Sequence, residues 1–290
     1  MPGANSVTSN QETLHKDLEQ VVRKYARTTF LRPIANHTRD AFAQVEEFVK
    51  KFYESKNGDP VPAQGRDDMV SGMTNAETAP VAVILDSGCG TGESTIHIAQ
   101  RFPGIPVIGI DKSYARLNKA GNPSQTAGED VPANAFWIRA ELLDFWRLAL
   151  EHVKSGKWTI PYHAVYYPNP WPKQSEATRR FHMHPIFPTL LALGETIELR
   201  TNWEIYAREF AEAARIVFEE WAGNDNEVAK GDSRLLRLRS AKAPAGMTNK
   251  DGMTINCESF DPSAPETAFE RKYKEARQKL WRVFVALPQL

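Results

Sequence analysis

A glycine-rich turn directly after an apolar run constrains the fold of this chain more than any other sequence feature. Residues 81–86 (VAVILD) form a continuous apolar run ending in an acid, as expected of a strand buried on both faces of a parallel sheet. The turn SGCGTG follows at 87–92, and a helix is predicted to begin near Gly92. Because glycines let the backbone turn sharply and approach a ligand closely, this order predicts a cofactor site at the end of the strand.

Strand and helix patterns alternate from residue 81 onward. Further strands are predicted at 106–111, 135–140, 163–169, 195–202, 234–240 and 280–287, with helices at 203–221 and 266–279. The segment between the last two strands, 240–265, is polar. This alternation predicts an α/β fold of the class I, Rossmann-like kind, with a seven-stranded, mostly parallel sheet and helices on both faces.

The N-terminal part of the chain has a different pattern. Apolar residues recur at helical spacing through 12–54, with Pro33 between two such patterns. Residues 56–80 are rich in glycine, proline and polar groups, which is typical of a linker or loop. We therefore expect a helical N-terminal extension at 1–55, a flexible linker at 56–80 and one α/β domain at 81–290.

Composition indicates the cellular compartment of the protein better than it indicates the binding partner. The 36 Lys and Arg residues balance the 36 Asp and Glu residues, so net charge does not indicate a nucleic-acid partner. Two cysteines, Cys89 and Cys257, fit neither a disulfide framework nor a zinc site. The polar N-terminus lacks a secretory signal, and no apolar run reaches the roughly 20 residues of a membrane span. We expect a cytoplasmic protein without membrane or metal partners, and the oligomeric state is left open.

Acids around the glycine turn favour one cofactor. Asp86 precedes the turn, and Asp111 ends the next strand, where a carboxylate can accept hydrogen bonds from both hydroxyls of a ribose. The pattern GCGTGES lacks the third glycine of the dinucleotide fingerprint GxGxxG. These features favour S-adenosylmethionine (AdoMet) over NAD and over a turn without ligand. The expected cofactor residues are Asp86, Gly88, Gly90, Gly92, Asp111 and Glu141.

Glu141 enters this set because it follows the third strand of the α/β domain, where an acid can face an adenine ring. The alternative is a solvated acid in the first turn of a helix, which the helix dipole favours. Asp144 is a weaker candidate for the same role.

Three further blocks carry a resemblance to a known family. They are YPNPWPK at 167–173, RTNWEIY at 200–206 and TAFERK at 267–272. They resemble the bacterial tRNA (guanine-N7)-methyltransferase family, in which the blocks are (F/Y)PDPWPK, TDxxxY and TxFExK. The similarity runs from about residue 81 to the end of the chain.

The resemblance implies AdoMet-dependent methyl transfer to N7 of a guanine in tRNA. It implies that the target base is surrounded by Asn169, Asn202, Thr267 and Glu270. It further implies substrate contacts from Trp171, Lys173, Arg179, Arg180 and Tyr206. Guanine N7 carries a lone pair and no proton, so direct displacement needs no general base, but nearby carboxylates would stabilise the charge that forms on the purine.

Asn169 and Asn202 depart from the family, which has Asp at both positions. Asn is neutral and presents one acceptor and one donor group, as would suit a different ring edge. A small nitrogen heterocycle is therefore an alternative acceptor to tRNA, and a non-catalytic AdoMet- or RNA-binding protein is a third interpretation. Simpler structural alternatives also remain: Asn202 as a helix N-cap, Glu270 as a surface acid, and the three prolines of 168–172 as a stiff loop.

Overall fold

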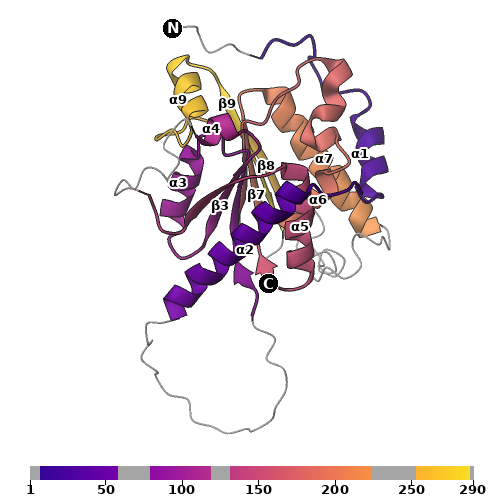
Figure 1. Cartoon of the computed structure of the whole chain (residues 1–290). Helices are drawn as coiled ribbons and strands as arrows, with labels where there is room; N and C mark the ends of the chain where they lie inside the picture. The colour runs from indigo at the N-terminus through magenta and orange to yellow at the C-terminus, as the bar shows by residue number, and fades with distance from the viewer. Residues whose placement is uncertain (1–6, 58–78, 119–130, 224–252, 288–290) are drawn as a thin grey trace, which may run out of the picture.

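The central element of the structure is a seven-stranded sheet (Figure 1). The structure is a computed structural model that describes residues 7–57, 79–118, 131–223 and 253–287. Within these ranges the strand order is β4-β3-β2-β6-β7-β9-β8. The strands are β2 (Ile84–Ser87), β3 (Val107–Asp111), β4 (Ala135–Arg139), β6 (His163–Tyr166), β7 (Thr196–Thr201), β8 (Thr254–Phe260) and β9 (Leu280–Ala286). The first five pair in parallel, and β9 runs antiparallel to β7 and β8, which confirms the predicted class I fold.

The direction of strand succession reverses beside β2. β3 pairs with one edge of β2 and β6 pairs with the other, both in parallel. Ligands of open α/β sheets bind outside the carboxyl ends of the strands at such a switch point. The turn after β2 and the loop after β6 are therefore placed at opposite sides of one crevice.

Helices cover both faces of the sheet (Figure 1). On one face, α3 (Glu93–Arg101) packs over a small apolar cluster that includes Ile84, Ile98 and Val107. The other face carries the larger core, to which Leu85 and Ile108 belong. Neighbouring strand residues thus enter opposite cores, as the two-residue period of a strand requires.

Five α-helices of the described residues contribute to the larger core, and two of them precede the sheet in the sequence. They are α1 (Leu18–Ala26), α2 (Asn36–Asn57), α5 (Leu142–Lys154), α6 (Phe187–Leu193) and α7 (Glu204–Gly223). α1 packs along α7, and α2 packs against α5 and β4. In the described part of the chain, no helix is both long and apolar enough to cross a membrane.

Two short strands and one edge strand differ from the sequence expectation. The run at 81–86 divides, because β1 (Val81–Ala82) pairs with β5 (Trp158–Thr159) in a separate two-stranded sheet. β8 lies within the polar segment 240–265, where no strand was expected. It is an edge strand without a fully buried side chain, so it needs no continuous apolar run. The strand predicted at 234–240 and residues 58–78 of the predicted linker lie outside the described residues.

A fully buried ion pair joins the segment after β6 to α7, and a hydrogen bond from Gln11 ties the N-terminal segment to the same carboxylate. Glu209 Oε2 accepts a hydrogen bond from Arg180 Nη1 at 2.6 Å and lies 2.9 Å from His182 Nε2, while Gln11 Nε2 donates to Oε1 at 2.5 Å. Burial would raise the pKa of Glu209, but the hydrogen bond with His182 and the charge of Arg180 hold it at about 2. Arg180 also donates twice to the Trp171 carbonyl, at 3.2 and 3.0 Å, so this cluster supports the loop after β6.

Replacing Glu209 with Gln should lower the free energy of unfolding by about 3–5 kcal/mol, because Arg180 would lose its counter-charge in a buried site. Urea unfolding at pH 7 measures the change, with Glu204→Gln, half-exposed on the same helix, as the control that should change little. The native pKa is depressed, so the difference should shrink as the pH falls from about 4.3 toward 2. A loss no larger than that of the control would contradict this assignment.

Candidate active site

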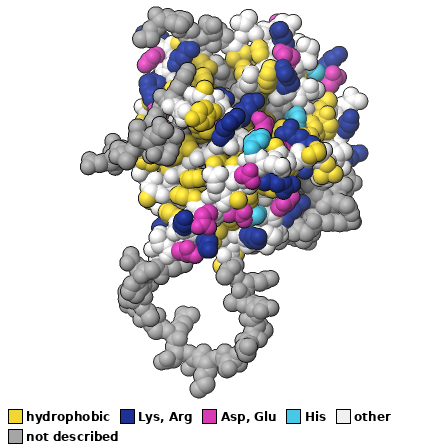
Figure 2. Space-filling model, viewed as in Figure 1, with side chains coloured by type: hydrophobic (Ala, Val, Ile, Leu, Met, Phe, Trp, Pro, Cys, Tyr) yellow, Lys and Arg dark blue, Asp and Glu magenta, His cyan; other side chains and the backbone are white. Residues whose placement is uncertain are grey.

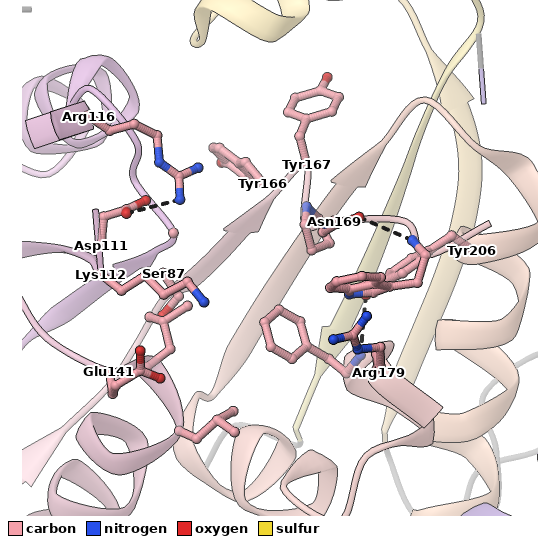
Figure 3. Close-up of a pocket in the computed structure, with 16 residues that line it drawn as sticks. Ser87, Asp111, Lys112, Arg116, Glu141, Tyr166, Tyr167, Asn169, Arg179 and Tyr206 are labelled. Atoms are coloured by element: carbon pink, nitrogen blue, oxygen red, sulfur yellow. Dashed lines mark hydrogen bonds and ion pairs between the residues drawn. The ribbon is translucent and has the colours of Figure 1, made fainter. Parts of the chain in front are cut away.

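A cavity of about 360 Å³ lies at the carboxyl ends of β2, β3 and β6 (Figure 3). Figure 3 shows Asp111 and Glu141 on one side of it and Asn169, Arg179 and Tyr206 on the other. We call it the cofactor cleft. Its lining consists of Ser87, Gly88, Asp111, Lys112, Arg116, Glu141, Leu142, Leu143, Tyr166, Tyr167, Pro168, Asn169, Trp171, Arg179, Phe181 and Tyr206.

Asp111 is held in place by backbone donors. Its Oδ2 accepts from the N–H of Gly90 at 3.1 Å, and its Oδ1 accepts from the N–H of Ser113 at 2.7 Å. Arg116 Nη2 lies 3.2 Å from Oδ1, but its side chain is half-exposed and can move aside. Each carboxylate oxygen has a further lone pair available, so Asp111 fits the two hydroxyls of a ribose.

The glycine turn has two kinds of glycine. Gly88, Gly90 and Gly92 all have positive φ angles, of 80°, 61° and 84°. Gly88 and Gly90 line cavities, and a Cβ added at Gly88 would meet open space. A Cβ at Gly92 would lie 2.0 Å from Trp137 Nε1, so this glycine permits close packing of α3 on the sheet. Gly92 therefore shapes the turn and does not line the cofactor cleft.

Asp86 also acts within the turn. Its Oδ2 accepts hydrogen bonds of 2.6 Å from the hydroxyls of both Ser94 and Thr95, at the start of α3. Burial raises the pKa of Asp86 to about 6, although these two hydrogen bonds lower it. The side chain is buried and does not line the cofactor cleft, so it holds α3 to the end of β2 and positions the turn from behind.

Glu141 precedes α5 and lines the cofactor cleft, where its half-exposed carboxylate lies 3.9 Å from Arg32. Asp144, the competing candidate, is buried and committed elsewhere. It accepts from Arg32 Nε at 2.9 Å and from the N–H of Ala35 at 3.2 Å. The structure therefore favours Glu141 as the acid that faces this part of the cleft.

A second cavity, of about 560 Å³, adjoins the cofactor cleft across Gly88, Tyr166, Tyr167 and Asn169, and we call it the acceptor cavity. The three sequence blocks meet here beside the glycine turn. The lining consists of Val7, Thr8, Gly88, Cys89, Gly90, Ser94, Arg116, Tyr166, Tyr167, Pro168, Asn169, Pro170, Pro172, Asn202, Thr267, Phe269 and Tyr273.

Asn169 and Asn202 both face the acceptor cavity. Asn169 Oδ1 accepts from the N–H of Trp171 at 3.3 Å (Figure 3), and Asn202 Nδ2 donates to Gln278 Oε1 at 3.2 Å. Asn202 is not a helix N-cap, since α7 begins at Glu204 and the side chain of Asn202 turns to Gln278 instead. Both amides are thus oriented by the chain before any ligand is bound.

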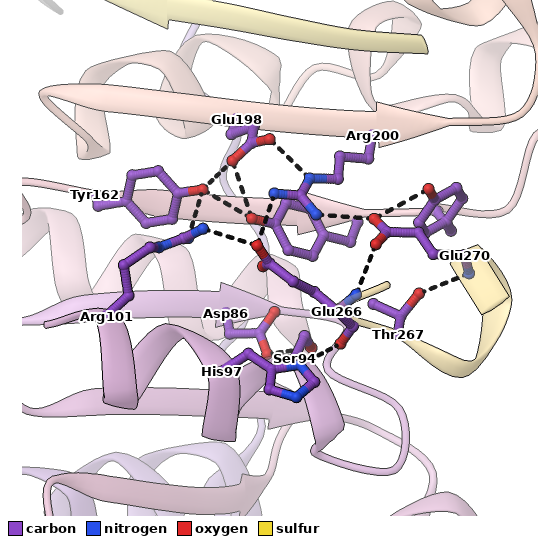
Figure 4. A network of polar contacts seen from close by, with 12 residues as sticks. Asp86, Ser94, His97, Arg101, Tyr162, Glu198, Arg200, Glu266, Thr267 and Glu270 are labelled. Carbon is purple, nitrogen blue, oxygen red and sulfur yellow. Dashed lines mark hydrogen bonds and ion pairs between the residues drawn. The ribbon is translucent and has the colours of Figure 1, made fainter. Parts of the chain in front are cut away.

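Thr267 and Glu270 are neighbours, but only Thr267 lines the acceptor cavity. Thr267 lines the acceptor cavity and caps α9 (Ala268–Glu275), where its Oγ1 accepts from the N–H of Glu270 at 3.0 Å. Glu270 is fully buried: its Oε1 accepts from Arg200 Nη1 at 2.8 Å and Tyr167 OH at 3.1 Å, and its Oε2 from the N–H of Glu266 at 2.7 Å (Figure 4). Glu270 is therefore neither a surface acid nor part of the cavity lining.

Arg200 is the centre of this polar network (Figure 4). Beyond Glu270, its guanidinium donates to Glu198 at 2.7 Å and to Glu266 at 3.3 Å. Burial lowers the pKa of Arg200, but Tyr166, the hydrogen bond with Glu198 and the charges of Glu198 and Glu270 raise it above its ordinary value, so the cation persists. Arg200, Glu198 and Glu266 were not among the site residues expected from the sequence. Their signal was Glu198 and Arg200 two positions apart in an apolar strand, which places both charges on one face of the sheet.

The expected substrate residues divide into exposed and buried ones. Trp171, which has a positive φ of 44°, lies under the Arg179 guanidinium at 3.9 Å from the ring centroid, and both line the cofactor cleft. Lys173 is exposed beside them and lines neither cavity. Arg180 is fully buried on the Trp171 carbonyl, and Tyr206 is buried in the wall of the cleft. Arg180 therefore lines neither cavity and supports the backbone of Trp171.

Comparison with known proteins places the chain in a family. A family model described as "Putative methyltransferase" matches residues 80–233, just over half of the chain. The tRNA (guanine-N(7)-)-methyltransferase of Mycolicibacterium gilvum is 33% identical over 138 residues, 45% of this chain and 49% of that protein. The enzyme of the same name from Treponema pallidum is 28% identical over 167 residues, 56% and 62% of the two chains.

A different methyltransferase matches a shorter stretch. The trans-aconitate 2-methyltransferase of Deinococcus radiodurans is 38% identical over 71 residues, 24% of this chain and 25% of that protein. The chain thus spans from a quarter to about 60% of the length of these curated relatives.

Among solved structures, the 16S rRNA methyltransferase KamB aligns over 76% of this chain and 97% of its own, with 15% identity and a TM-score of 0.41. The plantazolicin methyltransferase BpumL, solved with SAH, aligns over 94% and 97%, with 14% identity and a TM-score of 0.34.

The matched region contains the glycine turn, Asp111 and the loop after β6. Gly88 and Asp111 line a cleft at the strand switch point, where they fit a ribose-bearing cofactor. The chain therefore belongs to this family of methyltransferases, with AdoMet as its cofactor.

Proposed function

We propose that this protein transfers the methyl group of AdoMet to N7 of a guanine in tRNA. The observation that carries the proposal is the meeting of Asn169, Asn202 and Thr267 at one cavity beside the glycine turn. These residues come from three blocks that are far apart in the sequence. Relatives at 28% and 33% identity that are named tRNA (guanine-N(7)-)-methyltransferases support the same acceptor.

The reaction mainly requires that the methyl group and the acceptor nitrogen are aligned. AdoMet supplies an electrophilic methyl group, and guanine N7 offers a lone pair without a proton, so no side chain has to act as a base. Asp111 orients the ribose, and the turn at Gly88 and Gly90 lets the backbone approach closely. The loop that carries Asn169 then holds the acceptor ring on the opposite side of the turn. Because both reactants are held in place, the entropy cost of bringing them together is met on binding and not in the transfer step.

Contacts with tRNA phosphates would come from a few cations near the cavities. Lys173 and Arg179 are exposed on the loop after β6, and Lys272 is exposed on α9. On the face seen in Figure 2, Lys and Arg side chains are interspersed with Asp and Glu over the described residues. We therefore expect the phosphate-binding surface to be local and to make few ionic contacts.

A small nitrogen heterocycle is the second candidate acceptor. The described lining of the acceptor cavity contains no Asp or Glu, which sets it apart from a site that stabilises a purine cation with carboxylates. The neutral amides of Asn169 and Asn202 would suit several ring edges.

Methyl transfer to tRNA tests the proposal directly. Incubation with labelled AdoMet and tRNA that lacks 7-methylguanosine should give label in that nucleoside, identified by mass spectrometry after digestion. Label in a small heterocycle but not in tRNA would favour the second candidate. A folded protein that binds AdoMet and methylates no acceptor would contradict both.

Salt dependence separates tRNA from a small acceptor. Replacing Lys173 and Arg179 together with Ala should weaken tRNA retention and reduce the slope of log affinity against log salt by about 2, because each side chain that neutralises a phosphate accounts for close to one unit. Lys50→Ala, at an exposed position on α2, is the control and should leave the slope unchanged. An unaltered slope in the double variant would exclude these residues as phosphate ligands.

Asp111→Asn tests the cofactor cleft, since it keeps the shape of the side chain and removes its charge. We expect the Kd for AdoMet to rise about 10- to 100-fold, as for loss of hydrogen bonds to a charged group. Calorimetry on variants with unchanged thermal unfolding measures it, with Glu151→Gln, exposed on α5, as control. An unchanged Kd for Asp111→Asn would mean that the ribose lies elsewhere.

A further inference from the structure

We infer that the acceptor ring is held against an aromatic wall of Tyr167, Phe269 and Tyr273, and that this wall, in place of carboxylates, stabilises the positive charge the ring acquires. The inference rests on the proposed transfer to a ring nitrogen and specifies how that ring is held. It makes Phe269 and Tyr273 specificity-determining residues of the acceptor cavity.

The three rings form one continuous surface where the loop after β6 meets α9. Phe269 and Tyr273 stack at 6.1 Å between centroids with 23° between planes, and Tyr167 lies 6.2 Å from Phe269 and 5.7 Å from Tyr273. All three line the acceptor cavity. Phe269 remains 50% exposed, although burying such a ring is favourable, so its open face is available to a flat ligand.

In the described part of the chain, no carboxylate lines this cavity. The two positions where the resembled family has Asp carry the neutral residues Asn169 and Asn202. Glu270 is fully buried, and its two oxygens accept from Arg200, Tyr167 and the N–H of Glu266. Arg116 is the one charged side chain of the described lining, and it is paired with Asp111 at 3.2 Å. The faces of the aromatic rings are therefore the largest surface in this lining that attracts a cation.

The charge balance of the reaction shows why such a wall is useful. The lone pair of the ring nitrogen forms the new C–N bond, the C–S bond breaks, and its electron pair stays on sulfur. The positive charge therefore leaves sulfur and appears on the ring, and no proton is released. An aromatic face can stack on the neutral ring before transfer and attracts it more strongly once it is a cation.

The amides of Asn169 and Asn202 can fix the orientation of a ring that stacks on this surface. Trp171 N–H occupies Oδ1 of Asn169, so its Nδ2 is the group that can donate to a ring edge. Gln278 engages Nδ2 of Asn202, so its Oδ1 is the group that can accept. One neutral donor and one neutral acceptor suit a ring edge that carries both an oxygen acceptor and an N–H donor, as guanine does with O6 and N1–H.

Binding of matched neutral and cationic rings tests the wall. The probes are guanosine 5′-monophosphate against its 7-methyl derivative, and nicotinamide against 1-methylnicotinamide, titrated calorimetrically into protein saturated with S-adenosylhomocysteine. We expect the cationic member of at least one pair to bind about 5- to 10-fold more tightly. Phe269→Leu and Tyr273→Leu keep an apolar side chain but remove the aromatic face, so each should bring the preference below about 2-fold.

Conservative variants separate the aromatic face from general packing. Phe269→Tyr should retain the preference, and Tyr273→Phe should retain it too, because both keep the ring. Asn169→Asp should increase the preference even in the Phe269→Leu background, since it adds a carboxylate to the cavity. Thermal unfolding of each variant shows that the fold is kept, which the exposure of Phe269 favours.

Equal affinities within both pairs, no binding of any probe, or a preference that survives both leucine variants would each overturn the inference. These results are distinguishable from failure of the proposed function. Methylation of tRNA by a protein whose preference survives the leucine variants would leave the function standing without the wall. A wall-dependent preference for 1-methylnicotinamide without methylation of tRNA would support the wall and exclude guanine as its ring.

Discussion

The buried guanidinium of Arg200 is the group on which the arrangement of the acceptor cavity depends. It binds Glu198 within its own strand, Glu266 before α9 and Glu270 within α9. A buried charge is tolerated only when its partners offset the loss of hydration, so these carboxylates cannot leave Arg200 without a large cost. The start of α9 is therefore fixed at the end of β7. Tyr167, which donates to Glu270, is fixed with it, and the aromatic wall follows from the same contacts.

The two halves of the site differ in how closely they follow the family pattern. The proposed cofactor half consists of the glycine turn and Asp111 at the strand switch point, and the backbone N–H groups of Gly90 and Ser113 hold Asp111 in place. The proposed acceptor half carries Asn169 and Asn202, at the two positions where the resembled tRNA (guanine-N7)-methyltransferase family has Asp. The neutral amides and the engaged state of Glu270 point the same way, since both remove negative charge from one cavity.

Features set by local pattern could be predicted from the sequence. The buried strands, the glycine turn and Asp111 were located because apolar runs and glycines determine them within a few residues. β8 was missed because an edge strand with exposed polar side chains lacks that pattern. The glycine motif identified Asp86 and Gly92 as part of the turn, but it did not predict that Asp86 binds Ser94 and Thr95 or that Gly92 packs against Trp137. The burial of Glu270 away from the cavity could not be predicted, because it depends on an ion pair with Arg200, 70 positions away in the chain.

The most direct measurement is a crystal structure of the complex with S-adenosylhomocysteine and 7-methylguanosine 5′-monophosphate. We expect the methylated ring at van der Waals distance, about 3.5–4 Å, from the face of Phe269 or Tyr273, with Glu270 still bound to Arg200. A structure in which Glu270 has left Arg200 and its carboxylate contacts the ring would contradict a role for the aromatic wall, because a carboxylate would then stabilise the charge.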